Sequence, residues 1–236
     1  MRNFLTFNGK NLCDFSAFVS GEGTYDAPVK SVTREVVAGR NGDLLLDNGR
    51  YENIDITYPA YITDNFVHNI RQVRDYLNSV IGYARLEDTY HPDEFYLASF
   101  QNGIDVETLG RYNTLGRFDL TFNRKPQRFL KSGEVVNTYI ASGRITNPTL
   151  FESLPIIKIY GTGTVGIGQI NVTFDGSTPF VVLDCELQDA YYNGANKNSA
   201  ITLSPNRFPT LHTGDNGIVL GTGITRVEIT PRWWHL

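Results

Sequence analysis

The amino-acid sequence predicts a mainly β protein: an α+β N-terminal domain, with one helix on β-sheets and a long β-hairpin, followed by an all-β C-terminal sandwich. One stretch alone has the periodicity of an amphipathic helix, whereas the others are short strand-like runs separated by turns rich in glycine and asparagine. The composition, with 14 Phe, 13 Tyr, 22 Gly and one Met, also favours strands and turns. A chain of 236 residues is long enough for two domains that each bury a core.

The predicted helix covers residues 63–82. Its apolar residues recur at steps of three and four, which places them on one face: Phe66, Ile70, Val73, Leu77 and Val80, with Val67 and Ile81 widening the stripe. Thr63 or Asp64 can cap the first N–H groups, and Gly82 can adopt the left-handed conformation that ends a helix. Because the surrounding segments are strands, we expect this stripe to pack on a sheet.

Residues 31–46 predict a long β-hairpin. Asn41-Gly42, between Arg40 and Asp43, is a strong signal for a tight turn between two extended runs. The returning strand begins with three consecutive apolar residues, so both of its faces should be covered: Leu44, Leu45 and Leu46. A neighbouring subunit is one candidate cover, and the core of the chain itself is the alternative.

Further strands are predicted on both sides of the helix, at residues 4–7, 53–58, 83–86, 94–100 and 117–122. The last of these should stop where proline and charge follow it, and we place an inter-domain linker there: Lys125, Pro126, Gln127 and Arg128. The predicted domains are therefore residues 1–128 and 129–236. Beyond residue 128, short, evenly spaced strand-like runs predict an antiparallel sandwich. The tail containing Trp233 and Trp234 should dock against a domain of the chain or against a partner.

Charge and motif content favour no chemical activity. A net charge of −4 and a pI near 5.6 argue against direct nucleic-acid binding. The four histidines and two cysteines lack metal-ligand spacing, no cofactor motif is found, and residues 161–168 form a glycine-rich turn without the Lys-Ser/Thr of a phosphate loop. No stretch is apolar for long enough to cross a bilayer, and the cysteine usage fits synthesis in a reducing cytoplasm.

Two alternative functions come from the second half of the chain. Asp184 and Glu186 share one face of a strand and could form a glycosidase carboxylate pair, although a solvated or salt-bridged face is the stronger interpretation; Cys185 between them should be a core thiol. Exposed aromatic residues could instead stack on sugar rings in a carbohydrate-binding or receptor-binding module: Tyr191, Tyr192 or Trp234.

Several ordered features of the chain resemble the distal tail protein (Dit) family of long-tailed, non-contractile phages and prophages of Gram-positive bacteria. In the first half these are Gly39-Arg40-Asn41-Gly42-Asp43-Leu44, residues 53–58, the helix, residues 118–122 and Lys125-Pro126-Gln127-Arg128. In the second half they are residues 154–163, Asp184-Cys185-Glu186, Phe208-Pro209, Gly214-Asp215-Asn216 and residues 227–234. The set extends over nearly the whole chain, and its order makes it more specific than any single feature.

The resemblance implies a structural protein of the virion, made in the host cytoplasm, and no enzyme. Family members form a hexameric ring at the distal tail tip, a hub between the tail tube protein and the tail-tip or baseplate proteins. The N-terminal domain would form the ring around a lumen through which DNA passes, and the second domain would be a galectin-like sandwich. Ring closure requires two different patches on each subunit. We assign one of them to the hairpin: Arg40, Asn41, Gly42, Leu44, Leu45 and Leu46.

Overall fold

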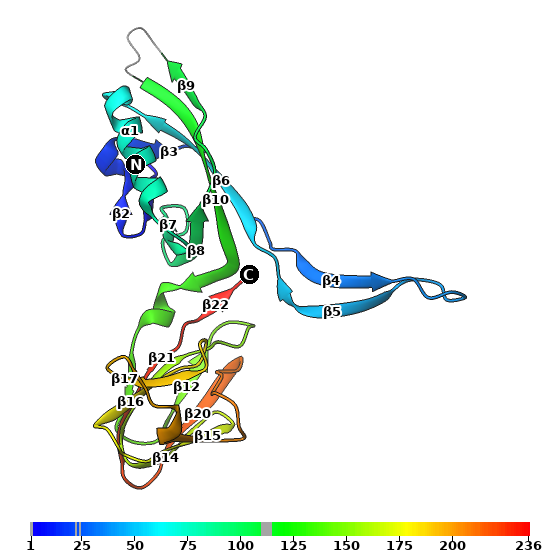
Figure 1. The fold of residues 1–236 in the computed structure, drawn as a ribbon, viewed down its shortest axis with the longest axis vertical. Helices are drawn as coiled ribbons and strands as arrows, with labels where there is room; N and C mark the ends of the chain where they lie inside the picture. Colours follow the sequence, from blue (N-terminus) through cyan, green and yellow to red (C-terminus); the bar gives the residue numbers. More distant parts are fainter. Residues whose placement is uncertain (1, 22, 24, 110–114) are drawn as a thin grey trace. The chain divides into compact units, whose positions relative to one another are not determined.

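A computed structural model describes residues 2–21, 23, 25–109 and 115–236 of the chain (Figure 1). The chain divides into two compact units, residues 1–128 together with Leu236, and residues 129–235. Each unit has its own cluster of buried apolar side chains. The predicted mainly β fold is confirmed, because antiparallel strands dominate both units and α1 is the one α-helix among the described residues.

The N-terminal unit is built on one large antiparallel sheet. Its strands follow the order β2 (Lys10–Asn11), β1 (Leu5–Phe7), β7 (Ala84–Asp88), β8 (Glu94–Phe100), β10 (Leu115–Leu130), β6 (Ile54–Ile62) and β3 (Ala17–Val19), with β9 (Val106–Leu109) also paired to β10. A 3₁₀ turn, η1 (Leu12–Phe15), precedes β3. Alternate residues of β6 and β10 point into the core, so these two strands carry much of the apolar face that α1 covers.

Helix α1 runs from Phe66 to Ser79 and buries Phe66, Ile70, Val73 and Leu77, as the periodicity predicts. The expected width of the stripe is wrong, since Val67 is 45% exposed and Ile81, beyond the helix end, is 96% exposed. The expected caps are also wrong. Asn65 occupies the N-cap position in the left-handed region without a side-chain hydrogen bond, and the helix ends at an extended Val80 before Gly82 turns left-handed.

The hairpin of the N-terminal unit consists of β4 (Lys30–Glu35) and β5 (Leu44–Tyr51), which form a two-stranded sheet of their own. The expected two-residue turn at Asn41-Gly42 is wrong, because residues 36–43 form the connection and the last strand pair is Glu35 with Leu44. Both Gly39 and Gly42 have positive φ in this loop. The loop therefore has two left-handed positions, and the Asn-Gly pair supplies only one of them.

The expectation that a strand ends before Pro126 is wrong for β10. It continues through Lys125, Pro126, Gln127 and Arg128 to Leu130, and the division between the units falls after Arg128. The ladder that β10 forms with β6 ends at the pair Arg124 and Ile54, so Pro126 lies beyond it. A missing N–H is tolerated where that side of a strand has no partner.

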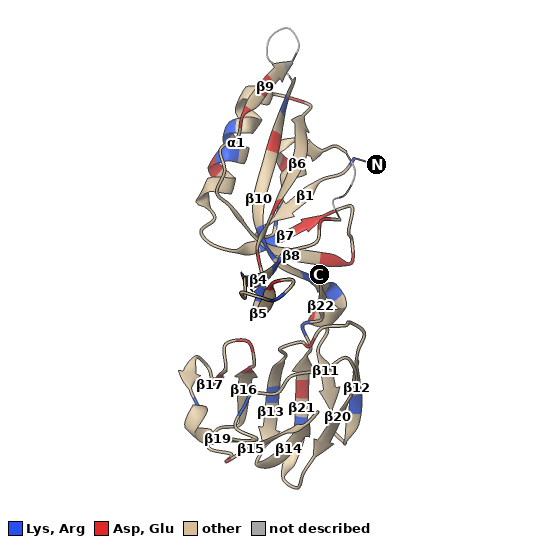
Figure 2. Ribbon diagram, turned by 90° about the vertical axis from the view of Figure 1, so that its right-hand side faces the viewer, with Lys and Arg blue, Asp and Glu red and all other residues tan. Residues whose placement is uncertain are grey.

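The C-terminal unit contains two antiparallel sheets (Figure 2). One has the order β11 (Asn137–Tyr139), β21 (Ile224–Thr230), β13 (Ile156–Gly161), β16 (Phe180–Asp184), β17 (Asp189–Tyr192), β18 (Ala195–Asn196). The other has the order β12 (Gly143–Asn147), β20 (Gly214–Leu220), β14 (Gly163–Ile167), β15 (Ile170–Phe174), β19 (Ile201–Ser204). Inward side chains of both sheets share one buried cluster, the arrangement of a sandwich, and two 3₁₀ turns, η3 (Lys131–Glu134) and η4 (Asn198–Ala200), complete the unit.

The final residues dock on the C-terminal unit beside its first residues. Trp233 is 5% exposed, and its carbonyl accepts a hydrogen bond of 2.9 Å from the Leu130 N–H. The Arg232 N–H donates to the Gly133 carbonyl at 2.8 Å, and β22 (Trp234–His235) pairs with β10. Of the two expected docking surfaces for the tryptophan tail, a domain of the chain or a partner, the structure shows the first.

Candidate subunit interface

The β4–β5 hairpin, which we call the arm, has a defined local structure. The Asn48 side-chain amide donates to the Ser31 and Thr33 hydroxyls at 3.2 and 3.3 Å, across the two strands. On the other face, Lys30 pairs with Asp47, and this pairing raises the pKa of Lys30 and lowers that of Asp47. These contacts join the two strands of the arm, and of the side chains involved only Ser31 is buried.

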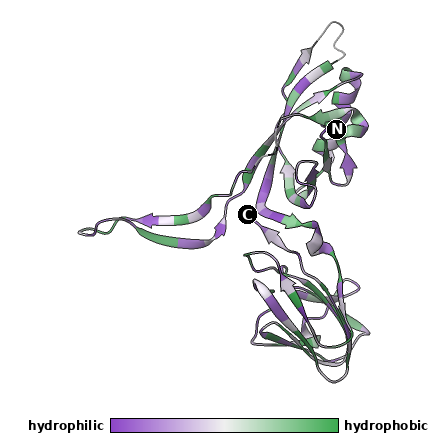
Figure 3. Ribbon diagram, turned by 180° about the vertical axis from the view of Figure 1, so that it is seen from behind, coloured by the Kyte–Doolittle hydropathy of each residue, from purple (hydrophilic) through white to green (hydrophobic). Residues whose placement is uncertain are grey.

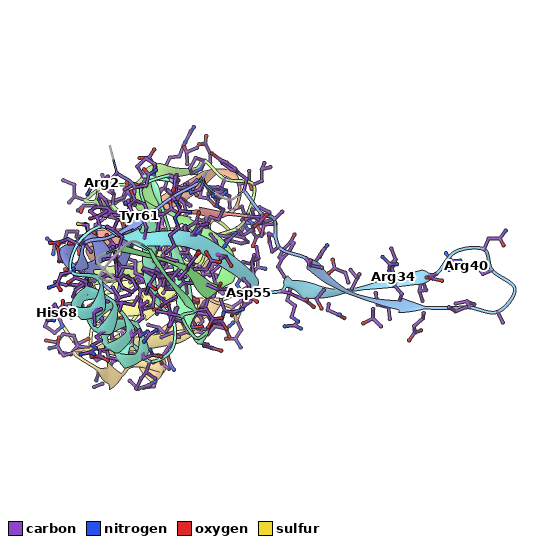
Figure 4. All side chains as sticks on the ribbon, turned by 90° about the horizontal axis from the view of Figure 1, so that it is seen from above. Arg2, Arg34, Arg40, Asp55, Tyr61 and His68 are labelled. Atoms are coloured by element: carbon purple, nitrogen blue, oxygen red, sulfur yellow. The ribbon has the colours of Figure 1, made fainter. Side chains whose placement is uncertain are left out.

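The residues predicted for the interface gather on the arm. Arg40, Asn41 and Gly42 lie exposed in its end loop, and Leu44, Leu45 and Leu46 begin β5. Leu45 is 62% exposed and Leu46 is 44% exposed, while Val36 in the loop is also bare. Figure 3 shows hydrophobic segments along the arm, and Figure 4 shows Arg34 and Arg40 with no other element of their unit beside them. The alternative in which these leucines belong to the core of the chain is therefore wrong.

The segment that leads into the arm is attached to the body of its own unit by a buried charged cluster. Arg124 is only 2% exposed, lies 4.8 Å from the centre of the Tyr96 ring and donates to the Asp26 carbonyl at 3.1 Å. The Tyr25 ring meets the His91 ring edge-on at 5.2 Å. The segment before the arm's first strand is thus held at Tyr25 and Asp26 by contacts within the N-terminal unit.

The cluster around Tyr96 is a part of the structure that sequence reasoning missed. Arg128 donates to the Tyr96 hydroxyl at 2.9 Å and pairs with Glu94, while the Tyr58 hydroxyl donates to Asp88 at 2.8 Å. Burial lowers the pKa of Arg124. The pKa of Arg128 is raised despite burial, because Arg128 donates to the Tyr96 hydroxyl and lies near the Glu94 carboxylate. The sequence indicated this cluster only through the four-residue spacing of Arg124 and Arg128, which places both side chains on the same face of a strand.

In the C-terminal unit, the carboxylates of the glycosidase alternative are engaged in an ion pair. Arg232 donates to both oxygens of Asp184, at 2.8 and 3.0 Å, and reaches Glu186 at 3.4 Å. Burial of Asp184 would raise its pKa, but these hydrogen bonds and those from backbone N–H groups hold it below its usual value. A carboxyl held ionised in this way is poorly suited to act as a general acid. Cys185 is buried in the core, as predicted, and burial raises the pKa of its thiol far above the usual range.

The aromatic residues of the sugar-binding alternative are dispersed over two strands. Trp234 stacks on Phe151 with ring centres 4.5 Å apart and donates its indole N–H to the Glu152 carbonyl at 2.9 Å. Tyr191 and Tyr192 are neighbours on β17, where Tyr192 meets the Phe180 ring edge-on at 4.9 Å. The rings of Trp234 and Tyr192 therefore already pack against other rings of the same unit.

The described residues contain no group of three or more His, Cys, Asp or Glu side chains that could hold a metal ion. An open groove of about 1060 Å³ lies along β6, β9 and β10 of the N-terminal unit. Asp105, Glu107 and Asp119 contribute carboxylates to it, and Arg117 contributes a cation. No helix in the described part of the chain is both long and apolar enough to cross a membrane.

Comparison with known proteins identifies one structural relative of particular relevance. No family model matches the chain, and no curated protein sequence matches it. Among solved structures, the chain is similar to the Dit protein (gp 19.1) of SPP1, described as a paradigm of the hub adsorption apparatus in phages that infect Gram-positive bacteria. The match covers 100% of both chains with a TM-score of 0.70 and 15% sequence identity. The resemblance to distal tail proteins predicted from the sequence is thereby confirmed at the level of the fold, which this chain shares over its whole length.

Proposed function

We propose that this chain is a structural phage tail protein that forms a hub at the distal tail tip. Six copies would close a ring between the tail tube protein and the tail-tip or baseplate proteins that adsorb to the host. The N-terminal unit would form the ring, and the C-terminal unit, a galectin-like sandwich in this proposal, would lie outside it. The role is geometric, so it requires neither catalysis nor a cofactor.

The observation that supports this proposal most strongly is the arm in a chain that matches a hub protein from end to end. Leu45, Leu46 and the two-stranded sheet that carries them are left largely without cover by the rest of the N-terminal unit, in a chain that matches the Dit protein over its whole length. Exposed apolar groups of this kind mark interaction sites. A closed ring requires each subunit to offer one patch and receive another. The arm supplies the first patch, and the edge of the neighbouring subunit's sheet would supply the second.

The charge of the chain supports a lumen that lets DNA pass. A net charge of −4 repels phosphate more than it attracts it, so DNA in the lumen would not be held by direct binding. Membrane insertion is no part of this role. In the virion the protein would stand at the tip of the tail, after synthesis in the cytoplasm of the host.

Light scattering across a concentration series, with negative-stain images of the same samples, tests the proposal. We expect the mass of six subunits, or of twelve if two rings pair, and rings with a central hole. A protein that remains monomeric at every concentration would contradict the assignment of the ring to this chain. Binding of the full chain on a glycan array, without any assembly, would favour the carbohydrate-binding alternative instead.

A further inference from the structure

Six asparagines of the chain are followed directly by glycine, and the structure places them in different surroundings. In such a pair the backbone nitrogen of the glycine can attack the side-chain carbonyl carbon of the asparagine, because glycine has no Cβ to hinder the approach. The asparagine then loses its amide, and asparagine is accordingly among the thermolabile residues of proteins. The pairs are Asn8-Gly9, Asn41-Gly42, Asn48-Gly49, Asn102-Gly103, Asn193-Gly194 and Asn216-Gly217.

Two of the pairs have a backbone geometry that prevents this attack. Asn8 and Asn193 have φ of 47° and 48°, and each forms a two-residue hairpin turn with the left-handed glycine that follows it. In the left-handed conformation ψ is about +47°, which turns the Cβ of the asparagine away from the next backbone nitrogen. The side-chain carbonyl therefore cannot reach that nitrogen while the turn is intact.

Asn48-Gly49, within strand β5, is held by hydrogen bonds at both reacting groups. The Asn48 amide donates to the hydroxyls of Ser31 and Thr33 at 3.2 and 3.3 Å. The Gly49 N–H donates to the Asp47 carboxylate at 2.9 Å, which engages the nitrogen that would attack. These bonds must break before the pair can react, and the free energy of breaking them slows the reaction.

Asn216 and Asn102 are also held through their side-chain amides. Asn216 is 3% exposed, and its amide donates to the carbonyls of His212 and Gly214 at 2.8 and 3.0 Å. Asn102 lies at the surface, and its amide donates to the Thr121 carbonyl over a longer distance, 3.5 Å. We therefore expect Asn216 to be the better protected of these two.

Asn41-Gly42 differs from the other five pairs. Both residues are exposed in the loop of residues 36–43, next to Arg40, which in Figure 4 has no other element of the N-terminal unit beside it. The φ of Asn41 is not positive, and its side chain has no hydrogen-bond partner among the described residues. Exposed loops also sample more backbone conformations than tight turns and strands do. The nitrogen of Gly42 is thus free to approach the side chain of Asn41.

We propose that Asn41 is a site of spontaneous deamidation that changes the charge of the arm. The Gly42 nitrogen forms a bond to the Asn41 side-chain carbonyl carbon, the bond from that carbon to the amide nitrogen breaks, and the amide leaves as ammonia with the proton of the Gly42 N–H. Water then opens the cyclic imide at either of its carbonyl carbons, which yields aspartate or isoaspartate. Water is the co-reactant, and no electrons are transferred.

The reaction changes the arm at its exposed end. The charged residues of the segment 30–52 balance before the reaction: Lys30, Arg34, Arg40 and Arg50 against Glu35, Asp43, Asp47 and Glu52. Deamidation adds a negative charge close to Asp43, and isoaspartate also lengthens the backbone by one carbon. A newly made chain and an aged chain therefore differ where we assigned the subunit interface, but the inference itself does not depend on the ring.

A single tryptic peptide compares the exposed pair with a protected one. Cleavage after Arg40 and Arg50 releases residues 41–50, which contain both Asn41-Gly42 and Asn48-Gly49. The full-length protein is incubated at mildly alkaline pH and digested briefly, and fragmentation mass spectrometry measures the replacement of each amide NH₂ by a hydroxyl; longer peptides that retain Arg40 are counted as well. Asn41 should react at least about tenfold faster than Asn48, the equivalent of about 1.4 kcal/mol for opening the Asn48 site.

Two controls show whether the structure causes this difference. In guanidinium chloride the hydrogen bonds of Asn48 are lost, so Asn41 and Asn48 should react at similar rates. An Asn41→Gln variant, whose longer side chain closes a ring more slowly, should leave position 41 unmodified over the same period and leave the rate at Asn48 unchanged.

The assignment to Asn41 is overturned if any other Asn-Gly pair of the native protein reacts as fast as Asn41. It is also overturned if Asn41 stays unmodified in the native protein over a period in which the unfolded protein reacts. Light scattering of the same samples measures assembly separately, so a failure of this inference can be distinguished from a failure of the ring.

Discussion

Gly133→Ala should detach the tryptophan tail from the C-terminal unit. A Cβ at Gly133 would lie 2.3 Å from the backbone nitrogen of Trp233, too close for any real contact, and backbone cannot yield as a flexible side chain can. Relief requires the tail to move, which breaks the bonds from Arg232 to Gly133 and from Leu130 to Trp233. Because Gly133 has an ordinary φ, the effect is steric and does not arise from backbone strain.

The size of the effect follows from what the tail loses. Two hydrogen bonds contribute about 1–3 kcal/mol together, and complete loss of a buried tryptophan would add about 3–5 kcal/mol. Because the tail shifts without being removed, we expect a loss of about 2–4 kcal/mol in unfolding free energy, between those limits. At a urea m-value of about 2 kcal/mol/M, the midpoint should fall by about 1–2 M.

Tryptophan fluorescence is the appropriate assay, since Trp233 and Trp234 are the two tryptophans of the chain and both lie in this tail. Gly217→Ala is the matched control, because a Cβ there meets nothing within 4 Å. It should change the free energy of unfolding by no more than about 0.5 kcal/mol. A Gly133→Ala protein with the same midpoint as the wild type would show that the close approach does not hold the tail.

Two further predictions concern the Asp184–Arg232 ion pair and the two cysteines. Arg232→Met should destabilise the unit by about 2 kcal/mol at pH 7, because it removes the partner of the Asp184 carboxylate. This is less than the cost of breaking a fully buried ion pair, since Arg232 is partly exposed. Because the pKa of Asp184 is lowered in the folded state, its contribution to stability is present above its unfolded pKa and is lost as the pH falls through its folded pKa. The difference in unfolding free energy between wild type and variant should therefore vanish in acid, which urea titrations at several pH values would measure. In native protein a thiol reagent should modify Cys13 and leave Cys185 unreacted until unfolding, because Cys185 is buried and its thiol pKa is raised; equal rates at both thiols would contradict this.

Local patterns predicted the fold class and the face of α1, because both depend on periodicity within a few residues. The edges of the stripe were not predicted correctly, since Val67 is exposed on the helix and Ile81 lies beyond the helix end at Ser79. The turn of the arm was misplaced for a related reason: Asn41-Gly42 indicates a left-handed position but does not fix the length of the loop around it.

The candidate interface was proposed because three consecutive apolar residues in a strand require cover on both of its faces. Whether they were core or interface required the structure, which leaves Leu45 and Leu46 uncovered. The burial of Arg124 could not be predicted, because the carbonyl of Asp26 that it binds is 98 residues away and Tyr96 comes from another strand. Proline suggested the end of a strand, but its effect depends on whether a partner strand needs its N–H, which a single sequence does not reveal.

The order in which the two cores are completed along the chain has a consequence for synthesis. Every fully buried apolar residue of the first core lies between Leu5 and Phe122, before the second unit begins. Domains fold as units during translation, at about 5–20 residues per second. The N-terminal unit can therefore fold, with its arm extended, while its ribosome is still translating the sandwich. For the ring proposed above, nascent chains on neighbouring ribosomes of one message would then present their arms to each other, so that assembly would begin before any subunit is released.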